Sequence, residues 1–296
     1  MSNLDSDQAS EVQWERLLPV EFRAAVHKRP VVYLPLGTVE WHGEHNALGL
    51  DSLKAHALCV QAAQRSGGVV HPPLYGGMGG LDMPATVQME GEESWDNNLL
   101  RPWLEKLCRE FHRLGFRAIL MLTGHYGHNQ QIVVRETGVR MTERLQIPVL
   151  GTPEYWLAQD VGYLGDHAGI GETSLLMHLH PELVKLERIR TDPDYGATDE
   201  IEKGSSAALG KRYTDVIVER LASVATTMPD WDAATRTAFV RGERAIVDAQ
   251  VRGWRREAPW AAWRKPFAGQ LVQYGENLAA GRFDLIEQLG AALYPN

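Results

Sequence analysis

Two short apolar runs, each ending at a glycine, constrain the fold of this chain more than any other feature of the sequence. They are residues 30–37 (PVVYLPLG) and 116–124 (FRAILMLTG), and residues 147–151 (IPVLG) form a weaker third run. Runs of this length without polar alternation are typical of strands buried on both faces of a parallel sheet. Between them lie helix-like stretches with apolar positions three and four residues apart, at residues 51–65, 94–114 and 129–145. Strands that alternate with helices predict a layered α/β fold.

The final third of the chain has a different texture. Beyond about residue 190, the stretches compatible with helix cover residues 205–226, 233–252 and 267–293, and no clear strand signal accompanies them. We therefore expect one domain over residues 1–296, with a core at about 17–190 and a helical extension at about 200–296. The extension carries four tryptophans: Trp231, Trp254, Trp260 and Trp263. We expect these indoles to pack helices together or against another subunit, with lining of the active site as the alternative.

The composition favours a small-molecule partner. The net charge of −8 comes from 38 acidic and 30 basic residues that are scattered along the chain, so nothing in it favours nucleic acid or an anionic membrane. Cys59 and Cys108 lack the Cys-x-x-Cys spacing, and we expect them to be buried thiols in the reducing cytoplasm. Residues 1–16 do not resemble a signal peptide, and no stretch approaches the roughly 18 apolar residues of a membrane span.

A first cluster of polar residues follows the first apolar run. Glu40 and His42 are two residues apart in a strand-end or extended segment, so their side chains can point the same way, and Asp51 returns at the start of a helix. One imidazole and two carboxylates suit zinc, manganese or iron. The alternative is that Asp51 only caps its helix while the others are surface groups.

A second cluster, residues 123–129 (TGHYGHN), follows the most apolar run. His125 lies immediately at the predicted strand end and is the better candidate for a ligand. His128 lies one step into a helix, where a histidine often satisfies backbone groups instead. Because polar loops after parallel strands meet at the carboxyl edge of the sheet, we expect the first two clusters to lie together.

A third cluster, residues 166–174 (DHAGIGETS), is a glycine-rich turn that enters an apolar helix. Glu172 lies in the first helical turn, where the helix dipole favours an acidic residue whatever its function. The neighbouring His167 favours a functional role for the cluster.

Other routes to catalysis are not supported by the sequence. There is no Gly-x-Ser-x-Gly elbow and no serine or cysteine nucleophile beside an obvious histidine base. The glycine-rich stretch at residues 75–80 lacks the Gly-Lys-Ser/Thr of a phosphate-binding loop, so we interpret it as a loop at the mouth of the site.

Taken together, the three clusters resemble the motifs of the creatininase family of metal-dependent amidohydrolases. The first motif, Glu-x-His-Gly-x-His with an Asp nine residues after the first His, is matched by Glu40, His42, Gly43, His45 and Asp51. The Gly-His-x-Gly-Asn loop is matched by Gly124, His125, Gly127 and Asn129, with His128 inserted, and the His-Ala-Gly-x-x-Glu-Thr-Ser motif by residues 167–174. The resemblance covers roughly residues 30–184.

The resemblance implies a three-layer α/β/α sandwich with a mostly parallel sheet and a site for two divalent cations, zinc foremost, with manganese or iron as alternatives. Asp51 would bridge the cations, with Glu40 and His125 on one side and His42 and Glu172 on the other. Creatininase has a metal-binding Glu where this chain has Gly127, so Glu172 is the preferred replacement and His128 its competitor. The resemblance also suggests a homo-oligomer, often a hexamer.

The implied activity is hydrolysis of a small cyclic amide or related carbonyl compound by a metal-activated water. His167 is the candidate proton shuttle, and Glu44 and His45 are second-choice residues for orienting substrate or ligands. Many family members carry Pro-Gly-Thr after the mouth loop, whereas this chain has Pro-Ala-Thr at residues 84–86. Two alternatives therefore stay open: hydrolytic C–C ring opening of a cyclic polyhydroxy ketone such as a keto-inositol, and a metal-stabilised binding protein without catalysis.

Overall fold

Four parallel strands form one sheet in the order β2-β1-β3-β4. The computed structural model describes residues 11–78, 85–87, 98–191, 198–256 and 271–293. The strands are β1 (Val31–Leu36), β2 (Val69–Val70), β3 (Ala118–Thr123) and β4 (Val149–Pro153). All residues of these strands are buried, as the apolar runs predicted. The two-residue strand β2 was not predicted.

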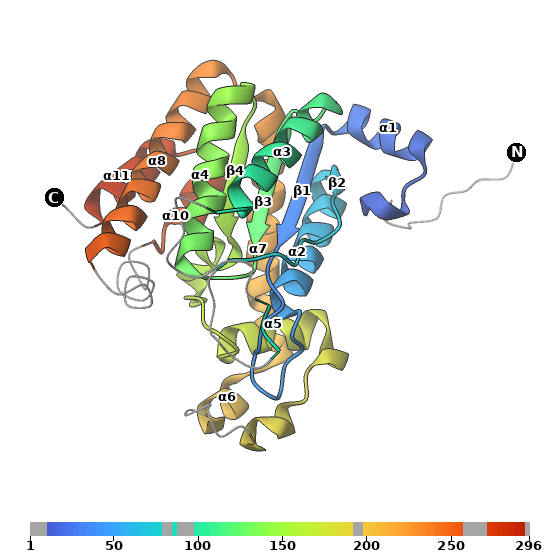
Figure 1. The fold of residues 1–296 in the computed structure, drawn as a ribbon, viewed down its shortest axis with the longest axis vertical. Helices are drawn as coiled ribbons and strands as arrows, with labels where there is room; N and C mark the ends of the chain where they lie inside the picture. Colours follow the sequence, from blue (N-terminus) through green and yellow to red (C-terminus); the bar gives the residue numbers. More distant parts are fainter. Residues whose placement is uncertain (1–10, 79–84, 88–97, 192–197, 257–270, 294–296) are drawn as a thin grey trace, which may run out of the picture.

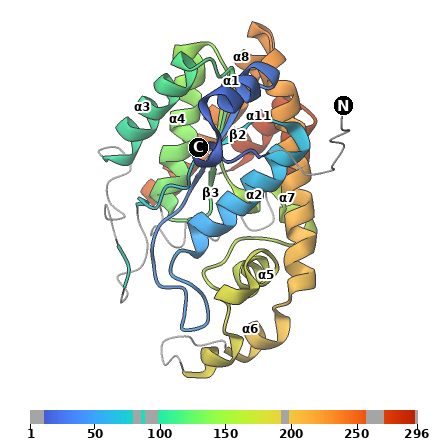
Figure 2. The same ribbon diagram turned by 90° about the vertical axis from the view of Figure 1, so that its right-hand side faces the viewer.

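Helices cover both faces of the sheet, which confirms the predicted α/β/α sandwich (Figure 2). Val32 and Leu34 of β1 pack towards α3 and α4, whereas the alternate residues Val31 and Tyr33 pack towards α2 and α7. The covering helices are α2 (Leu50–Ser66), α3 (Leu100–Arg113), α4 (His128–Leu145) and α7 (Ala207–Thr227).

The C-terminal helices are part of the packed body. Helix α7 contacts α2 and α5, and α8 packs along α4 and α11 (Figure 1). Trp231 packs against Phe239 and Phe283, with ring centroids 5.3 and 5.0 Å away, as expected for a packing role. The side chain of Trp254, together with Trp260 and Trp263, lies outside the described residues. The helices of this region are α8 (Ala233–Arg256), α10 (Tyr274–Ala279) and α11 (Phe283–Ala292).

The two ends of the sheet differ in what covers them (Figure 1). Helix α1 (Pro19–Lys28) lies near the amino ends of the strands, whereas α5 (Ile170–Leu179) and α6 (Thr198–Gly204) lie beyond the carboxyl ends. The short 3-10 helices are η1 (Trp14–Arg16), η2 (Glu154–Leu157), η3 (Gln159–Val161), η4 (Pro181–Leu183), η5 (Leu186–Thr191) and η6 (Met228–Asp230).

Two further expectations concern the cysteines and the membrane. Cys59 and Cys108 are buried free thiols. Among the described helices, none has both the length and the apolar character that a membrane span requires.

Candidate metal centre

The candidate site lies at the carboxyl edge of the sheet, between its two central strands. Leu36 at the end of β1 pairs with Thr123 at the end of β3, so the segments that carry Glu40 and His125 start side by side. Strand β2 lies on one side of β1 and β3 lies on the other, so the connections that follow β1 and β2 run in opposite directions. Open α/β sheets form their binding sites at this point of the carboxyl edge.

Gly124 lets helix α2 begin against the end of β3. A Cβ atom at Gly124 would lie only 2.1 Å from the carbonyl oxygen of Asp51, so a side chain there would push Asp51 out of the site. Gly49 is the N-cap residue of α2, and no side chain caps this helix. Asp51 therefore lies in the first turn of α2 and is not its N-cap residue.

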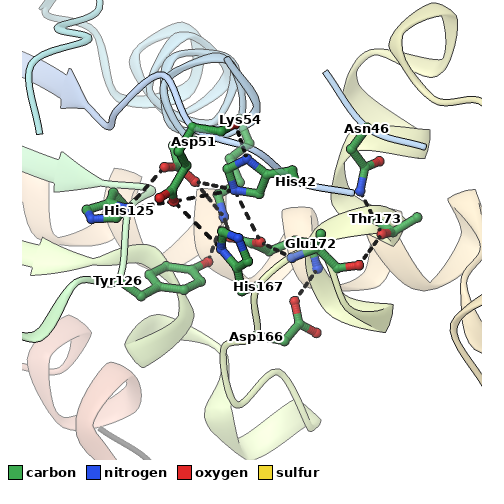
Figure 3. Close-up of polar contacts among 12 residues, drawn as sticks. His42, Asn46, Asp51, Lys54, His125, Tyr126, Asp166, His167, Glu172 and Thr173 are labelled. Atoms are coloured by element: carbon green, nitrogen blue, oxygen red, sulfur yellow. Dashed lines mark hydrogen bonds and ion pairs between the residues drawn. The ribbon is translucent and has the colours of Figure 1, made fainter. Parts of the chain in front are cut away.

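Glu40, Asp51 and His125 form one donor set, meaning a group of side chains whose ligand atoms could bind one metal ion. Figure 3 shows Asp51 and His125 turned towards each other. The Nδ1 of His125 lies 2.9 Å from Oε1 of Glu40 and 3.2 Å from Oδ2 of Asp51. Its Nε2 lies 3.1 Å from the carbonyl oxygen of Met78, which can only accept a hydrogen bond. In the neutral imidazole this contact places the proton on Nε2, so the lone pair of Nδ1 faces the carboxylates and can bind a cation.

His42, Asp51 and Glu172 form the second set. The Nε2 of His42 lies 3.2 Å from Oδ1 of Asp51 and 3.7 Å from Oε2 of Glu172. Its Nδ1 donates a hydrogen bond of 3.0 Å to the carbonyl oxygen of Glu40. Both histidines therefore have one nitrogen held by a backbone carbonyl and the other turned to carboxylates, which is the usual arrangement of metal-binding histidines.

Asp166 holds the first turn of α5 and thereby places Glu172. Its Oδ2 accepts a hydrogen bond of 2.6 Å from the amide of Gly171, and its Oδ1 accepts one of 3.0 Å from the amide of Glu172. Burial, followed by the nearby charge of Glu172, raises the pKa of Asp166 to about 6. The amide of Ala168 also donates to Oε2 of Glu172, at 2.7 Å.

The ligand atoms of the two donor sets are arranged more favourably for binding divalent cations than for hydrogen bonding among themselves. Within each set the ligand atoms lie within 4.8 Å of one another, and Asp51 belongs to both sets. Oε2 of Glu40, Nε2 of His42 and Oδ2 of Asp51 are buried without a hydrogen bond of good geometry. Cations between these atoms would satisfy them. The five predicted ligands are thus brought together in the predicted pairs, while their role as ligands stays a prediction.

The electrostatics agree with this fit. Burial by itself lowers the pKa of His42, but Asp51, Glu172 and Glu40 outweigh burial and raise the pKa to about 9. Burial is likewise outweighed at His125, where Glu40 and Asp51 raise the pKa well above its usual value. A site that holds protons this firmly has an excess of negative charge, which also attracts metal cations.

His167 lies at the rim of the centre. Its side chain is 30% exposed, and its Nδ1 lies 3.6 Å from Oε1 of Glu40. Burial and then the neighbouring His42 lower its pKa, which favours the neutral imidazole that a proton acceptor needs. Donor atoms of His167, Glu40 and His42 also lie within 4.8 Å of one another, so the geometry fits a ligand as well as a shuttle.

The other predicted candidates lie apart from the donor sets. The Nε2 of His128 donates to the carbonyl oxygen of Gln250 at 3.1 Å, so His128 faces helix α8 and is a poor competitor for Glu172. A Cβ atom at Gly127 would lie 2.6 Å from Nε2 of His125, so a metal-binding Glu does not fit there in this conformation. Glu44 is exposed, and no described contact links its side chain to the donors.

His45 supports the third motif. Its Nε2 lies 3.2 Å from the carbonyl oxygen of Ala168 and 3.1 Å from Oγ1 of Thr173. Asn46 donates to the same hydroxyl group at 3.0 Å. His45 therefore helps to orient the turn that carries Glu172, in line with its second-choice role.

Sequence reasoning missed a buried polar network behind the second donor set. Lys54 is fully buried, and its Nζ contacts Glu172, Glu154 and Tyr126. Tyr126 donates to Glu154 and shares a hydrogen bond with Tyr163. One signal was available: Lys54 lies one helical turn after Asp51, on the buried side of α2 with Ala55 and Leu58.

The altered Pro-Ala-Thr triplet lies beside the first motif where it is described. Ala85 has a φ of 61°, a conformation in the left-handed region that favours glycine. Thr86 accepts a hydrogen bond of 3.0 Å from the amide of Trp41. Ala85 therefore adopts a backbone conformation that a glycine would adopt more easily.

A model of the family described as creatinine amidohydrolase matches residues 15–225. The match covers well over half of the sequence. The chain belongs to the creatininase family. Creatininase-family membership makes it a metal-dependent hydrolase, as its motifs predicted.

Characterised relatives in the family differ in what they act on. The creatinine amidohydrolase of Pseudomonas putida is 31% identical over an alignment of 189 residues, and the match covers 55% of this chain and 69% of the relative. A mycofactocin precursor peptide peptidase of Mycolicibacterium smegmatis is 27% identical over 74% of this chain and 81% of its own. A 3-dehydro-scyllo-inosose hydrolase of Thermotoga maritima is 23% identical over a match that covers 63% of this chain and 62% of the relative.

Solved creatininase structures share the fold. One creatinine amidohydrolase structure superimposes with a TM-score of 0.60 at 23% identity, covering 74% of this chain and 99% of its own. Other creatininase structures with this fold include a Zn–Zn type and a manganese form.

Proposed function

We propose that this protein hydrolyses a small cyclic amide or related carbonyl compound at a centre of two divalent cations. The observation that carries the proposal is the pair of buried donor sets that share Asp51. A mononuclear zinc site needs three or four ligands, so five donors arranged around one shared carboxylate suit two cations.

Two divalent cations held by the donor sets around Asp51 would lower the pKa of a water molecule towards neutrality and polarise a carbonyl group. The chain's own residues then hold and move protons. His167, partly exposed beside Glu40, accepts the proton of the attacking water at a ring nitrogen and returns it to the leaving nitrogen. Trp41 lies beside this residue, with its ring centroid 6.5 Å from that of His167.

Zinc is the proposed native metal, with manganese or iron as alternatives, because the donors are imidazole nitrogens and carboxylate oxygens. The buried free thiols Cys59 and Cys108 suit a reducing compartment, and we propose the cytoplasm. We also propose a homo-oligomer, with a hexamer as the first state to test by light scattering.

The test begins with protein purified without chelator. Elemental analysis should find about two divalent transition metal ions per chain. The metal-loaded protein is then assayed against creatinine, formamides, cyclic polyhydroxy ketones and a short peptide. Turnover of creatinine or a formamide supports the proposal, whereas turnover of the ketone alone identifies the C–C hydrolase and turnover of the peptide alone identifies a peptidase. Bound metal without turnover of any compound identifies a binding protein, and absence of metal with no gain on adding zinc or manganese contradicts the metal centre.

A further inference from the structure

Lys54 is a buried cation next to the candidate metal centre. Its side chain is fully buried, and its Nζ contacts the carboxylate of Glu172, Oε1 of Glu154 at 3.0 Å and the hydroxyl group of Tyr126 at 2.9 Å. These three partners match the three N–H groups of an ammonium group. The same Nζ lies 4.3 Å from the centroid of the Tyr126 ring. Lys54 is therefore held in place rather than free to swing away.

The cation contacts Glu172 of the second donor set, whereas no described contact links it to Glu40 or His125, the two ligands that belong to the first set alone. It is paired with Glu172 and lies 4.0 Å from Oδ1 of Asp51, which is the oxygen that faces His42. On the other side, the ion-pair partners of Glu40 within the described residues are histidines. The two halves of the centre therefore differ by a fixed positive charge.

A fixed positive charge changes metal affinity in two ways. It repels a divalent cation directly, and it draws electron density from the carboxylate that it contacts. Both effects are strong where water is excluded, because nearby charges are poorly screened in the protein interior. Both act mainly on the set formed by His42, Asp51 and Glu172.

We infer that Lys54 makes the two metal positions unequal, so that the position of His42, Asp51 and Glu172 binds its divalent cation more weakly, fills second and empties first. This inference rests on the proposed two-metal centre. Glu154 limits the inequality, because its carboxylate lies 3.0 Å from Nζ and offsets part of the charge of Lys54.

The test uses the full chain, stripped of metal with a chelator and titrated with Zn²⁺ against a chromophoric competitor. A parallel titration with Co²⁺ follows the absorption spectrum of each step. Titrations run at about pH 8, because burial raises the pKa of Glu154 to about 7 and the carboxylate must be ionised. The wild type should bind two equivalents with affinities that differ about tenfold or more.

Lys54→Met removes the charge with a side chain of similar length. The second step should become tighter by about tenfold or more while the first changes much less, so the two steps converge. Lys54→Arg keeps the charge and is the matched control, in which the wild-type separation should persist. In the Co²⁺ titration, the absorption change that accompanies the second equivalent should reach its end point at a lower excess of Co²⁺ in Lys54→Met, and not in Lys54→Arg.

Glu154→Gln should act in the opposite direction. It removes the negative partner of Lys54 and leaves the cation, so the second step should weaken further. The double variant Lys54→Met with Glu154→Gln should fall between the two single variants. If Lys54 only positioned Glu172 or supported the fold, Lys54→Met would weaken the second step, and that result overturns the inference.

Failure of the inference and failure of the proposed function give different results. A wild type that binds no metal contradicts the proposed function itself. A wild type with two equal steps that Lys54→Met leaves unchanged overturns the inference alone. If Lys54→Met does not fold, Glu154→Gln decides, because an equal or tighter second step in that variant overturns the inference.

Discussion

The protein contains two buried charged clusters that are built in opposite ways. The candidate metal centre collects three carboxylates, Glu40, Asp51 and Glu172, around two imidazoles and leaves several of their atoms without a good hydrogen bond. The second cluster, where α4, α8 and α10 meet, pairs the single cation Arg135 with the single anion Glu243. One cluster has excess negative charge, and the other is balanced within the chain.

The second cluster pairs its charges within the chain, although Nε of Arg135 is buried without a hydrogen bond to a described residue. Arg135 pairs with Glu243, donates to the hydroxyl group of Tyr274 at 3.0 Å and lies 4.1 Å from the centroid of the Trp156 ring. Tyr274 in turn donates to Glu243 at 2.8 Å. Because buried charges are costly unless paired, a balanced cluster holds a fold together, whereas an unbalanced one needs ions from outside the chain.

Asp51→Asn should cause the largest loss of activity, because Asp51 is shared by both donor sets. An amide offers one neutral acceptor and a donor that repels cations, so both metals should be weakened together. We expect turnover to fall by about a thousandfold or more and metal content to drop for both positions. Elemental analysis and steady-state rates on this variant check the prediction. A variant that keeps both metals and a near-normal rate would remove Asp51 from the centre.

His167→Ala should cause a smaller loss by a different route. A shuttle at the rim affects proton transfer rather than metal binding, so kcat should fall about 10²- to 10⁴-fold while the metals remain. The acidic limb of the pH–rate profile should change as well, because the neutral imidazole that accepts the proton, and that is lost on protonation at low pH, is gone. Metal content that falls in parallel with kcat would make His167 a ligand.

The sequence predicted the fold class and the long strands, but not the shortest strand or the division of the last helical segment. The long strands were visible because each is an apolar run buried on both faces. Strand β2 was missed because Val69 and Val70 form a strand only by pairing with β1, and two residues carry no periodic signal. The predicted helix over residues 267–293 is described as two helices, α10 and α11, which the local pattern did not separate.

The two clusters were predictable to different degrees for a physical reason. Ligand histidines and carboxylates gather after strand ends with short, regular spacing, so the metal centre was visible in the sequence. The partners Arg135 and Glu243 are 108 residues apart, and each alone resembles a solvent-exposed helical residue. Lys54 was missed in the same way, because its partner Glu172 lies 118 residues away.

Arg135→Met should have the smallest effect on the metal centre of the changes considered, and should lower the stability of the fold instead. The change leaves Glu243 buried without its cation, which typically costs about 3–5 kcal/mol of unfolding free energy. Metal content and kcat at low temperature should stay near wild type, because no described contact links Arg135 to the donor sets.

The double variant Arg135→Met with Glu243→Met decides whether the second cluster is only structural. Replacing both members of a buried ion pair with apolar side chains of similar volume is often neutral or stabilising. We therefore expect the double variant to recover most of the stability that Arg135→Met loses, as measured by the midpoint of urea unfolding in metal-loaded protein. The metal centre cannot be repaired in this way, since an apolar pair supplies no ligand. If the double variant stays as unstable as the single one, Tyr274 and Trp156 need the charged pair for their own packing, and the cluster does more than balance charge.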